Sequence, residues 1–369
     1  MKNVIDLFAG CGGFSTGFMQ AGFKIVKAVE FDKQIADSYA KNHIGTITIA
    51  DDIKNVDNES FFAERDADII IGGPPCQGFS MAGARIRTGH EFVNDPRNYL
   101  FKHYLNVVRL VKPEIFVFEN VKGILTMNNG DIFREIIKEF SDADNFGGDK
   151  YSVAFKVAHA VEYGIPQKRE RVIIFGTKNK SVDFDMLFEK TKDRIKKDLP
   201  TFFDSVSVWD AISNLVEPTL NGVVENSTPK SSFQRYLHSD KATIENHTKT
   251  NHSSKAIERM SKIGCGENFT ALDENIKSIH SGSYGRLEKD GIAPTIVTRF
   301  DTPSGGKFTH PTENRTLTPR EAARIQSFPD DFVFYGNKTS VCKQIGNAVP
   351  PKMAYFIANV IKEFYNENN

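Results

Sequence analysis

Short apolar runs rich in β-branched residues alternate with amphipathic stretches over residues 1–178, and this alternation restricts the fold more than any other feature. It is typical of an α/β domain built on a parallel sheet. The apolar residues of stretch 132–140 recur with a period of about 3.6, which predicts a helix, and helices are also expected at 34–41 and 100–111. The predicted strands cover residues 4–9, 24–30, 46–50, 68–72, 114–119, 151–158 and 171–177.

The chain has 369 residues, whereas single hydrophobic cores stop growing at roughly 250–300 residues. From about residue 180 to 310 the periodicity weakens, polar residues become frequent, and the only tryptophan, Trp209, occurs there. Helical patterns return at 319–326 and 353–363. We expect a catalytic and cofactor-binding domain over 1–185, a smaller loop-rich domain over 186–310, and a return segment over 311–369 that completes the first domain.

Composition argues against several classes of protein. The 47 basic and 47 acidic residues cancel, so net charge alone does not indicate a nucleic-acid binder. Four cysteines are too few and too scattered for a disulfide framework, and His247, His252 and Cys265 do not form a metal set, so we expect no metal. No apolar run approaches the roughly 20 residues of a membrane span, and Asp6 interrupts any signal-peptide pattern. We expect a cytoplasmic protein without membrane contact.

A buried strand runs into a glycine-rich turn within residues 4–14. Glycine permits a tight turn and the close approach of a ligand, although the G-x-G-G pattern lacks the last glycine of a dinucleotide-binding turn. Glu30 ends the second predicted strand, where its carboxylate can accept hydrogen bonds from a ribose. Asp52 and Ile53 follow the third strand and suit an adenine. A generic turn with solvated acids is the alternative, but three such strand ends favour a nucleoside.

The stretch from Ile69 to Ser80 carries the strongest chemical signal. An apolar strand stops abruptly, and Pro74 and Pro75 rigidify the backbone immediately before Cys76. A cysteine in a rigid, partly exposed and electropositive setting suits a reactive thiolate. The alternative is a buried, inert thiol, which is how we interpret the other three cysteines.

Glu119 and a run of cations supply further candidate groups. Glu119 ends a thoroughly apolar strand, where a partly desolvated carboxyl can share or donate a proton, although a strand-end cap is the alternative. Arg169 and Arg171 precede the last predicted strand and share its parity, so both can point one way. They could hold a phosphate and a carbonyl oxygen through forked hydrogen bonds. A solvated charge run is the other explanation.

With these elements in this order, the chain resembles the C5-cytosine DNA methyltransferase family, of the bacterial restriction-modification type, over nearly its whole length. Six blocks carry the resemblance: residues 6–13 (DLFAGCGG), 73–80 (GPPCQGFS), 119–121 (ENV), 167–171 (QKRER), 315–330 (RTLTPRE through QSFPD) and 344–350 (QIGNAVP). The resemblance implies a Rossmann-like, S-adenosyl-methionine-dependent methyltransferase sheet with a smaller target-recognition domain.

The resemblance also implies a mechanism on a cytosine that has swung out of double-stranded DNA. Cys76 attacks carbon 6, Glu119 engages N3, Arg171 holds O2, and Arg169 lies nearby on the backbone. Carbon 5 then takes the methyl group of S-adenosyl-methionine, which leaves as S-adenosyl-homocysteine. Besides the turn residues Gly10 and Gly12, the positions that match cofactor contacts of the family are Phe8, Glu30, Phe31, Asp52, Ile53, Pro75, Leu100 and Asn347.

DNA contacts follow from the same resemblance. Residues 80–97 correspond to a family loop that closes over DNA, and Ser80, Arg85 and Arg87 are its candidate contacts. In the middle domain, Arg286 and Arg299 are candidates for reading guanine, with phosphate contact or simple solvation left open. Double-stranded DNA is the expected partner of a monomeric enzyme, and a restriction endonuclease acting on the same site is a possible second partner.

Three other functions remain as alternatives. An RNA cytosine methyltransferase would use the same thiol but needs little recognition domain. An amino-methylating DNA enzyme would place an acid or Asn before the two prolines and an aromatic residue after them, whereas this chain has Gly73 and Cys76. A catalytically silent DNA-binding module would not need Cys76, Glu119 and Arg171 together. The recognised DNA sequence cannot be read from the chain.

Overall fold

The computed structural model describes residues 1–75, 99–274, 276 and 280–368, and it divides into two compact units. Unit 1 comprises Met1–His159, Glu170–Asp193 and Ala354–Asn369, and unit 2 comprises Ala160–Arg169 and Arg194–Met353. The last helix thus ends in unit 1, while residues 311–353, which the sequence placed in the return segment, cluster with unit 2. Among the described residues, no helix is long and apolar enough to cross a membrane.

Unit 1 is built on a seven-stranded sheet with the order β3-β2-β1-β4-β5-β8-β6. All seven strands lie where the apolar runs predicted them. Their bounds are β1 Asn3–Leu7, β2 Lys24–Val29, β3 Ile47–Ile49, β4 Ile69–Gly72, β5 Ile115–Val121, β6 Tyr151–His159 and β8 Glu170–Lys178. The α/β fold class predicted from the sequence is confirmed.

The sheet is mixed, however, and not wholly parallel as the alternation suggested. β8 pairs antiparallel with both β5 and β6, while the pairs among the other five strands are parallel. The reason lies in the connection: β6 and β8 are joined without a crossover helix, and strands joined in this way pair antiparallel. The parallel strands β1 to β5 therefore end at one common edge.

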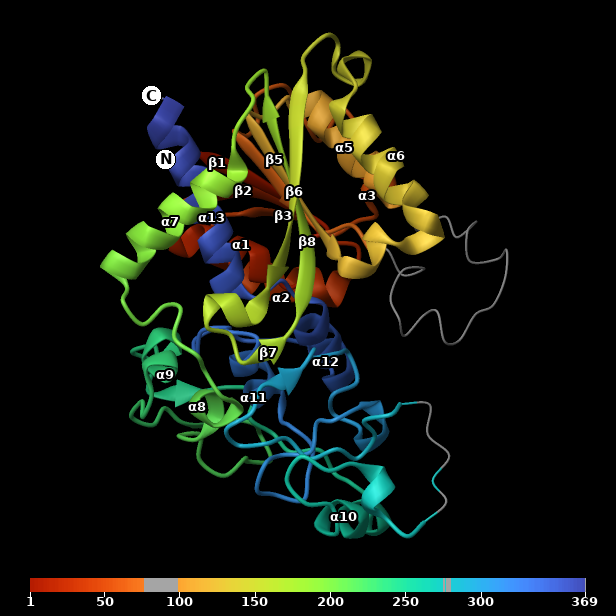
Figure 1. Cartoon of the computed structure of the whole chain (residues 1–369), viewed down its shortest axis with the longest axis vertical. Helices are drawn as coiled ribbons and strands as arrows, with labels where there is room; N and C mark the ends of the chain where they lie inside the picture. The colour runs from red at the N-terminus through yellow and green to blue at the C-terminus, as the bar shows by residue number, and fades with distance from the viewer. Residues whose placement is uncertain (76–98, 275, 277–279, 369) are drawn as a thin grey trace. The chain divides into compact units, whose positions relative to one another are not determined.

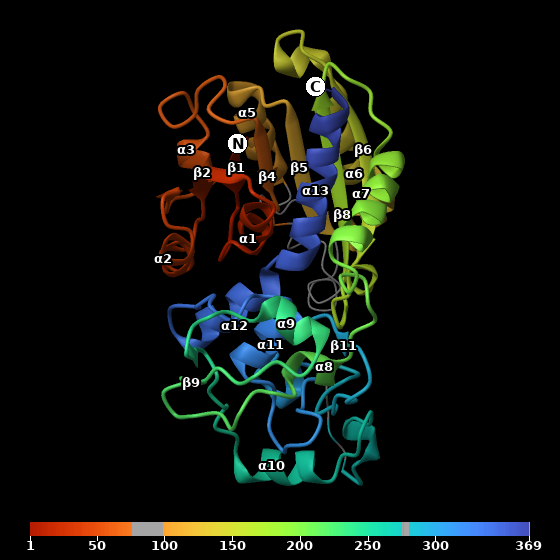
Figure 2. The same ribbon diagram turned by 90° about the vertical axis from the view of Figure 1, so that its left-hand side faces the viewer.

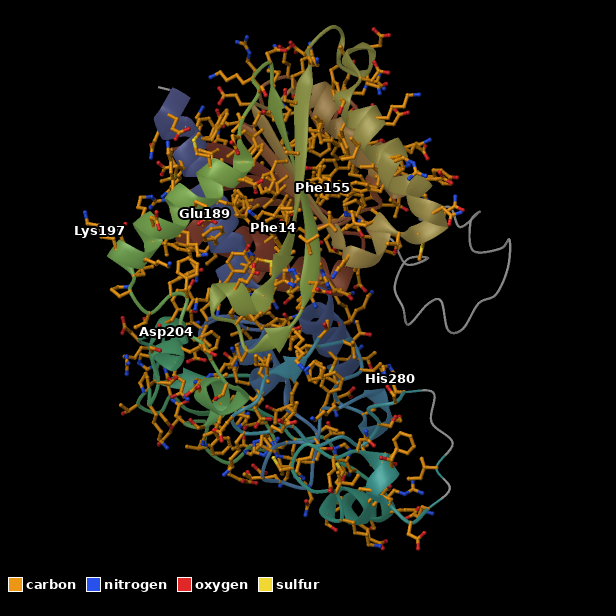
Figure 3. The ribbon with its side chains drawn as sticks, viewed as in Figure 1. Phe14, Phe155, Glu189, Lys197, Asp204 and His280 are labelled. Atoms are coloured by element: carbon orange, nitrogen blue, oxygen red, sulfur yellow. The ribbon has the colours of Figure 1, made fainter. Side chains whose placement is uncertain are left out.

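Helices cover both faces of this sheet, as Figures 1 and 2 show: α3, α5 and α6 lie on one face and α1, α7 and α13 on the other. In Figure 3, Phe14 lies on α1 directly after the glycine turn, and its ring meets Phe18 edge-on at 5.4 Å. The helices of unit 1 are α1 Gly13–Gln20, α2 Lys33–Asn42, α3 Ile53–Val56, α5 Leu100–Val111, α6 Asp131–Ser141, α7 Phe184–Asp198 and α13 Pro351–Asn368, of which α7 and α13 each extend into unit 2 at one end.

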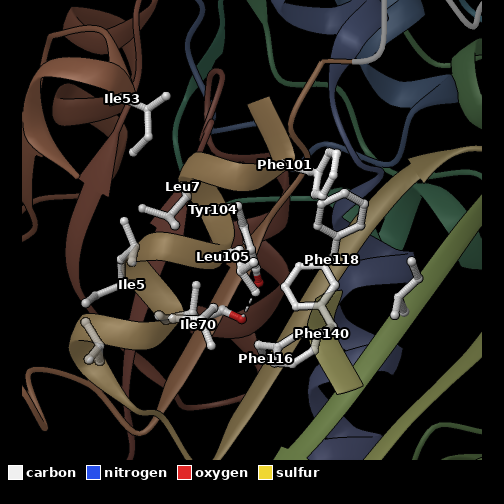
Figure 4. Close-up of a cluster of buried hydrophobic side chains, with 14 of the residues drawn as sticks. Ile5, Leu7, Ile53, Ile70, Phe101, Tyr104, Leu105, Phe116, Phe118 and Phe140 are labelled. Carbon is white, nitrogen blue, oxygen red and sulfur yellow. Dashed lines mark hydrogen bonds between the residues drawn. The ribbon is translucent and has the colours of Figure 1, made fainter. Parts of the chain in front are cut away.

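Tyr104 of α5 organises the core beneath α5 and α6 (Figure 4). Its ring packs edge-on against Phe118 and Phe140, with centroids 5.3 and 5.9 Å apart. Its hydroxyl donates to the carbonyls of Ile70 and Val117 at 3.1 and 3.0 Å. Because a buried hydroxyl is costly unless it is bonded, these contacts fix α5 against β4 and β5. Those two strands end at the site described below.

Helix α7 was not expected from the sequence, whose residues after 180 suggested a loop-rich region. Its apolar side chains Phe184, Leu187, Phe188 and Ile195 are nevertheless buried at helical spacing. Phe188 meets Phe356 of α13 at 5.4 Å, so α7 covers the sheet together with the last helix. Charged residues separate these apolar positions, so the helical spacing was not recognised in the sequence.

Unit 2 has little regular structure and relies on buried arginines. Arg324 pairs with Asp330, donating at 2.8 and 2.9 Å, and Arg320 donates to the carbonyls of Glu245, Pro329 and Phe332. Guanidinium groups thus bond loop carbonyls that no strand reaches. The elements are β7 Gln167–Lys168, α8 Val208–Ile212, β9 Val224–Glu225, α9 Ser232–Leu237, β10 Thr243–Ile244, α10 Ser254–Ser261, β11 Ala293–Pro294, α11 Pro319–Ile325 and α12 Lys338–Asn347.

Candidate functional site

The candidate site of unit 1 lies at the edge where β1 to β5 end. The strand order reverses between β1 and β4, because β2 and β3 extend the sheet on one side and β4 and β5 on the other. In open α/β sheets, ligands bind at such a switch point, beyond the carboxyl ends of the strands. Most of the expected cofactor residues follow β1, β2 and β3. Among the expected catalytic residues, Glu119 lies near the end of β5 and Arg171 lies on the neighbouring strand β8.

The turn after β1 has an unusual backbone. Phe8 and Gly10 both have a φ of 57°, and Gly12 has a φ of 96°. A side chain at Gly12 would collide with the ring of His43, whereas one at Gly10 would meet no described atom within 4 Å. The ring of His43 therefore packs against the turn at Gly12, and no described side chain lies where a Cβ at Gly10 would be. Phe8 is held in a left-handed conformation that non-glycine residues seldom adopt, which is common at ligand sites.

Glu30 ties the end of β2 to this turn. One carboxylate oxygen accepts from the backbone N–H of Gly10 and the other from that of Asp32, both at 2.9 Å. Both carboxylate oxygens of Glu30 thus hold backbone at the end of β2 and in the turn. Phe31 beside Glu30 is 72% exposed, so its ring is accessible to a ligand.

The end of β3 and the start of α5 complete this half of the site. Asp52 caps α3 by accepting from the backbone N–H of Lys54 at 3.1 Å, and Ile53 is buried. Leu100, the first residue of α5, is buried as well. Ile53 and Leu100 belong with Leu7 to one buried apolar cluster, against which Phe8 packs. Apolar side chains and a carboxylate at these strand ends suit an adenosine group.

The sequence did not predict the hydrogen bonds that link three buried polar side chains near the turn, Asp6, Ser15 and Tyr39. Asp6 accepts from the Ser15 hydroxyl at 2.6 Å, and that hydroxyl lies 2.7 Å from the Tyr39 hydroxyl. Burial, together with the charge of Glu30, raises the pKa of Asp6 to about 7 even though the bond from Ser15 lowers it. Burial also lowers the pKa of His43 to about 4. The only sequence signal was an acid within an apolar strand.

The ends of β4 and β5 bring the predicted catalytic residues together. Glu119 forms an ion pair with Arg171, with Nε and Oε1 2.8 Å apart. Its other oxygen lies against Gly73, where an added Cβ would be only 2.6 Å away. Cys76 lies outside the described residues, but Pro75, its neighbour in the chain, is described. A paired carboxylate thus lies beside the backbone that leads to Cys76.

Asn120 holds that backbone. Its side-chain amide donates to the carbonyl of Pro74 at 3.1 Å, and its amide oxygen accepts from the N–H of Val121. Burial lowers the pKa of Arg171, while the charge and hydrogen bond of Glu119 raise it. Sequence reasoning identified Glu119 and Arg171 but assigned no role to Asn120 or Gly73, because their contacts join separate strands.

Arg169 and Arg171 do not point to one place, contrary to the expectation from strand parity. β7 ends at Lys168 and β8 begins at Glu170, so Arg169 lies between two strands, where parity does not apply. Arg169 is buried within unit 2 and donates to the carbonyls of Gly346 and Ala348 at 3.2 and 2.6 Å. It is therefore engaged by backbone groups and not presented to a phosphate.

The two candidate base-reading arginines of unit 2 also differ. Arg286 is buried, and its five N–H donors are occupied by the carbonyls of Met260, Ile263, His310 and Glu313 and by the Asn314 side chain. The expectation that Arg286 reads guanine is therefore wrong for this conformation. Arg299 is exposed. Ser80, Arg85 and Arg87 lie outside the described residues.

The remaining predicted residues are spread over both units. Asn347, the last residue of α12, belongs to unit 2 and is exposed. Cys11 and Cys342 are buried, and burial raises the pKa of each thiol to about 12. Cys265 is exposed. Neither buried cysteine is poised to act as a thiolate near neutral pH.

The strand order, the glycine turn after β1 and the ligand edge define the Rossmann-like fold of S-adenosyl-methionine-dependent methyltransferases. The chain belongs to the C-5 cytosine-specific DNA methylase family, whose family model matches residues 2–363. It is a DNA (cytosine-5) methyltransferase, as the sequence predicted.

Relatives and a solved structure agree with this assignment. The chain is 36% identical to the type II methyltransferase M1.HphI of Haemophilus parahaemolyticus, over 97% of this chain and 86% of that protein. It is 32% identical to the type II methyltransferase M.DdeI of Desulfomicrobium norvegicum, over 100% and 90%. A crystal structure of a prophage-encoded DNA modification methyltransferase from E. coli superposes with a TM-score of 0.75 at 28% identity, covering 99% of this chain and 100% of that one.

Proposed function

We propose that the chain transfers a methyl group from S-adenosyl-methionine to carbon 5 of an extruded cytosine in double-stranded DNA, through a covalent adduct of Cys76. The observation that carries this proposal is the contact of Glu119 with both Arg171 and Gly73, three residues before Cys76. Glu119 could then donate a proton to N3 and Arg171 a hydrogen bond to O2 of one pyrimidine, beside the backbone that leads to Cys76.

The residues after β1, β2 and β3 fit the proposed cofactor. A Cβ at Gly10 would meet no described atom within 4 Å, Glu30 offers a carboxylate at a strand end, and Phe31 offers an exposed ring for an adenine face. We propose that these residues, with Phe8, Gly12, Asp52, Ile53, Pro75, Leu100 and Asn347, bind S-adenosyl-methionine. When bound, this cofactor supplies an electrophilic methyl group on a sulfonium.

The chemical steps follow from the roles of three side chains. The Cys76 thiolate attacks carbon 6 of the cytosine, forming a carbon–sulfur bond and moving an electron pair toward N3. Glu119 in its protonated form donates to N3, and Arg171 donates to the O2 carbonyl, so both stabilise the negative charge that develops there. Carbon 5 becomes nucleophilic and would take the methyl group as its bond to the sulfonium breaks, which leaves S-adenosyl-homocysteine. Loss of the carbon 5 proton to a base then expels the thiolate and restores the aromatic ring.

DNA binding is assigned to residues that the structure leaves exposed or does not describe. We propose that Ser80, Arg85 and Arg87 contact DNA near the extruded base and that Arg299 contacts a base or a phosphate. Extrusion is necessary because the ring carbons of a stacked cytosine cannot be reached. Unit 2 carries Arg299 and would select the sequence, which fits the type II methyltransferases among the relatives. A restriction endonuclease acting on the same site is the proposed functional partner.

The decisive experiment maps 5-methylcytosine at base resolution in plasmid DNA from cells that express the protein. We expect one short motif to be methylated throughout and no signal with Cys76→Ser. The matched control is Cys265→Ser, which changes an exposed cysteine and should methylate like the wild type. Methylation that persists in Cys76→Ser would exclude the proposed nucleophile. DNA containing 5-fluorocytosine should also trap a denaturant-resistant adduct with the wild type.

A further inference from the structure

The carboxyl end of α12 is held by side chains from elsewhere in unit 2. The last carbonyls of a helix have no partner within the helix and need one from outside. Gln326 donates to the carbonyl of Ile345 at 2.7 Å, and Arg169 donates to those of Gly346 and Ala348 at 3.2 and 2.6 Å. The cation of Arg169 also lies at the negative end of the helix dipole, which favours it there.

Arg169 therefore forms hydrogen bonds with the backbone on both sides of Asn347. One guanidinium nitrogen bonds the carbonyl before this residue and the other bonds the carbonyl after it. A planar fork suits such a two-point contact, whereas the ammonium of a lysine acts as a single point. The side chain of Asn347 itself remains exposed. The guanidinium thus fixes where that side chain starts and how it is directed.

Two further contacts make this end of α12 rigid. Gly346 lies so close to the backbone of Val297 and Thr298 that an added Cβ would be 2.6 Å from both. Arg169 also donates to the carbonyl of Ile296 at 3.5 Å, so one guanidinium joins the helix end to the same backbone stretch.

Lys352 makes a second contact between the same two segments, this time from residues 345–352 to residues 160–169. Lys352 is buried and donates to the carbonyl of Gly164 at 3.2 Å, and its ammonium lies 4.6 Å from the ring centre of Phe202. Residues 160–169 and 345–352 are thus joined twice, by Arg169 from one segment and by Lys352 from the other. Such reciprocal contacts within one unit restrict the backbone that carries Asn347.

We propose that Arg169 is a positioning residue for Asn347 and thereby sets the affinity for S-adenosyl-methionine, without touching DNA. The inference rests on the proposed function, in which Asn347 contacts the cofactor. It replaces the role of Arg169 that the sequence suggested. Helix ends fray easily, and the two hydrogen bonds from Arg169 hold this end of α12 in place. The amide side chain of Asn347 is thereby kept in one position.

The test measures the dissociation constants of S-adenosyl-homocysteine and of a DNA duplex separately, by calorimetry and by fluorescence anisotropy. Arg169→Lys keeps the charge but replaces the two separate guanidinium nitrogens by a single nitrogen on a shorter side chain, so it cannot reproduce the two-nitrogen contact with Gly346 and Ala348. We therefore expect S-adenosyl-homocysteine to bind roughly tenfold more weakly. The affinity for DNA should stay unchanged. Arg235→Lys, on the exposed face of α9, is the matched control and should leave both constants as in the wild type.

A double-mutant cycle with Asn347→Ala separates positioning from general loosening. If Arg169 acts through Asn347, Arg169→Lys should weaken binding of S-adenosyl-homocysteine much less in the Asn347→Ala background than in the wild type. Equal losses in both backgrounds would refute the proposal. So would weaker DNA binding with unchanged binding of S-adenosyl-homocysteine, because that result restores a DNA contact.

A second variant covers the case in which Arg169→Lys does not fold. Gln326→Leu removes the bond to the carbonyl of Ile345 without changing charge, and it should also weaken binding of S-adenosyl-homocysteine. A folded Gln326→Leu protein with wild-type affinity would then refute the proposal. If the wild type itself binds no S-adenosyl-homocysteine, the proposed function fails instead, so the two failures are distinguishable.

Discussion

Glu119 and Arg171 form their ion pair diagonally across two antiparallel strands. Residue 119 of β5 lies opposite Ile173 of β8, and Arg171 lies opposite Val121, two residues further along. Diagonal neighbours on one face of a sheet are within reach of long side chains. The side chains of the pair are 11% and 13% exposed, so water competes little with their 2.8 Å contact.

Removing the charge of Glu119 should abolish most of the methyl transfer. Glu119→Gln keeps the shape of the side chain but leaves the buried Arg171 without its counter-charge, and the amide is a poor proton partner for N3. We expect single-turnover methylation to slow by about 10²–10⁴-fold, the range for a lost acid–base group. The measurement is rapid-quench transfer of a radioactive methyl group to duplex DNA.

Glu170→Gln is the control for that variant. Glu170 is adjacent to Arg171, but it pairs with Lys122 at the surface, and such exposed pairs contribute little. Its rate should stay within about threefold of the wild type. Equal rates for Glu119→Gln and Glu170→Gln would remove Glu119 from the mechanism.

Gly73 should be intolerant of any side chain because of Glu119. The Cβ of Gly73→Ala would lie 2.6 Å from the Glu119 carboxylate, closer than van der Waals contact allows, so the carboxylate must move. We expect a loss of at least about tenfold in the transfer rate, since a displacement near 1 Å can cost 10²-fold. Binding of S-adenosyl-homocysteine, measured by calorimetry, should be unaffected.

A compensating change tests the cause of that loss. Glu119→Asp shortens the side chain by one methylene and leaves room for the new methyl group. In the Gly73→Ala background it should lower the rate less than it does alone. A Gly73→Ala enzyme with the wild-type rate would show that this contact is absent in the working enzyme.

The strands of the sheet could be predicted because each is a local apolar run, and the glycine turn because its sequence is contiguous. The pairing of Glu119 with Arg171 could not be derived in the same way, since it depends on the register and direction of β8. Nothing in the apolar run of β8 distinguishes it from one more parallel strand. The resemblance to a family supplied the roles of these residues where local pattern could not.

The surroundings of two arginines, Arg169 and Arg286, could not be predicted from the sequence. Arg169 and Arg286 occur in polar surroundings of the sequence, yet both are buried and bond carbonyls remote in the chain, such as Ala348 and His310. No residue near either arginine in the sequence predicts these hydrogen-bond partners. Local composition therefore cannot distinguish an arginine that reads DNA from one that holds loops together.

The buried carboxyl of Asp6 should make stability depend on pH. Its pKa is about 7 in the folded state, against 3.8 for a freely solvated aspartate, so the folded state retains a proton that the unfolded state has lost between these values. Stability from this group is therefore full below pH 4 and is lost as the pH rises through 7. A tenfold change in proton affinity between the two states corresponds to about 1.4 kcal/mol.

Asp6→Asn removes this titration. In urea denaturation at several pH values, the free energy of unfolding of the variant relative to the wild type should increase from pH 4 to 7 and level off above pH 8. Asp37→Asn, on the surface of α2, is the control and should show no such trend. A difference that is constant with pH would contradict the assignment of the raised pKa to Asp6.

The ion pair of Glu321 with Arg315 should dominate the acid stability of unit 2. Burial alone would raise the pKa of Glu321, but the hydrogen bonds and charge of Arg315 bring it down to about 2 from 4.5. This stabilisation is present above pH 4.5 and is lost as the pH falls toward 2.

Glu321→Gln leaves Arg315 with only Glu313 and should cost about 3–5 kcal/mol at pH 7, the usual effect of breaking a buried pair. The measurement is denaturant unfolding, with Glu225→Gln as a surface control. The deficit should shrink progressively below pH 4.5, because the unfolded wild type then binds a proton at Glu321 that the folded state binds only near pH 2. A deficit of equal size at pH 7 and pH 3 would mean that the lost hydrogen bonds, and not the charge of Glu321, stabilise this part of unit 2.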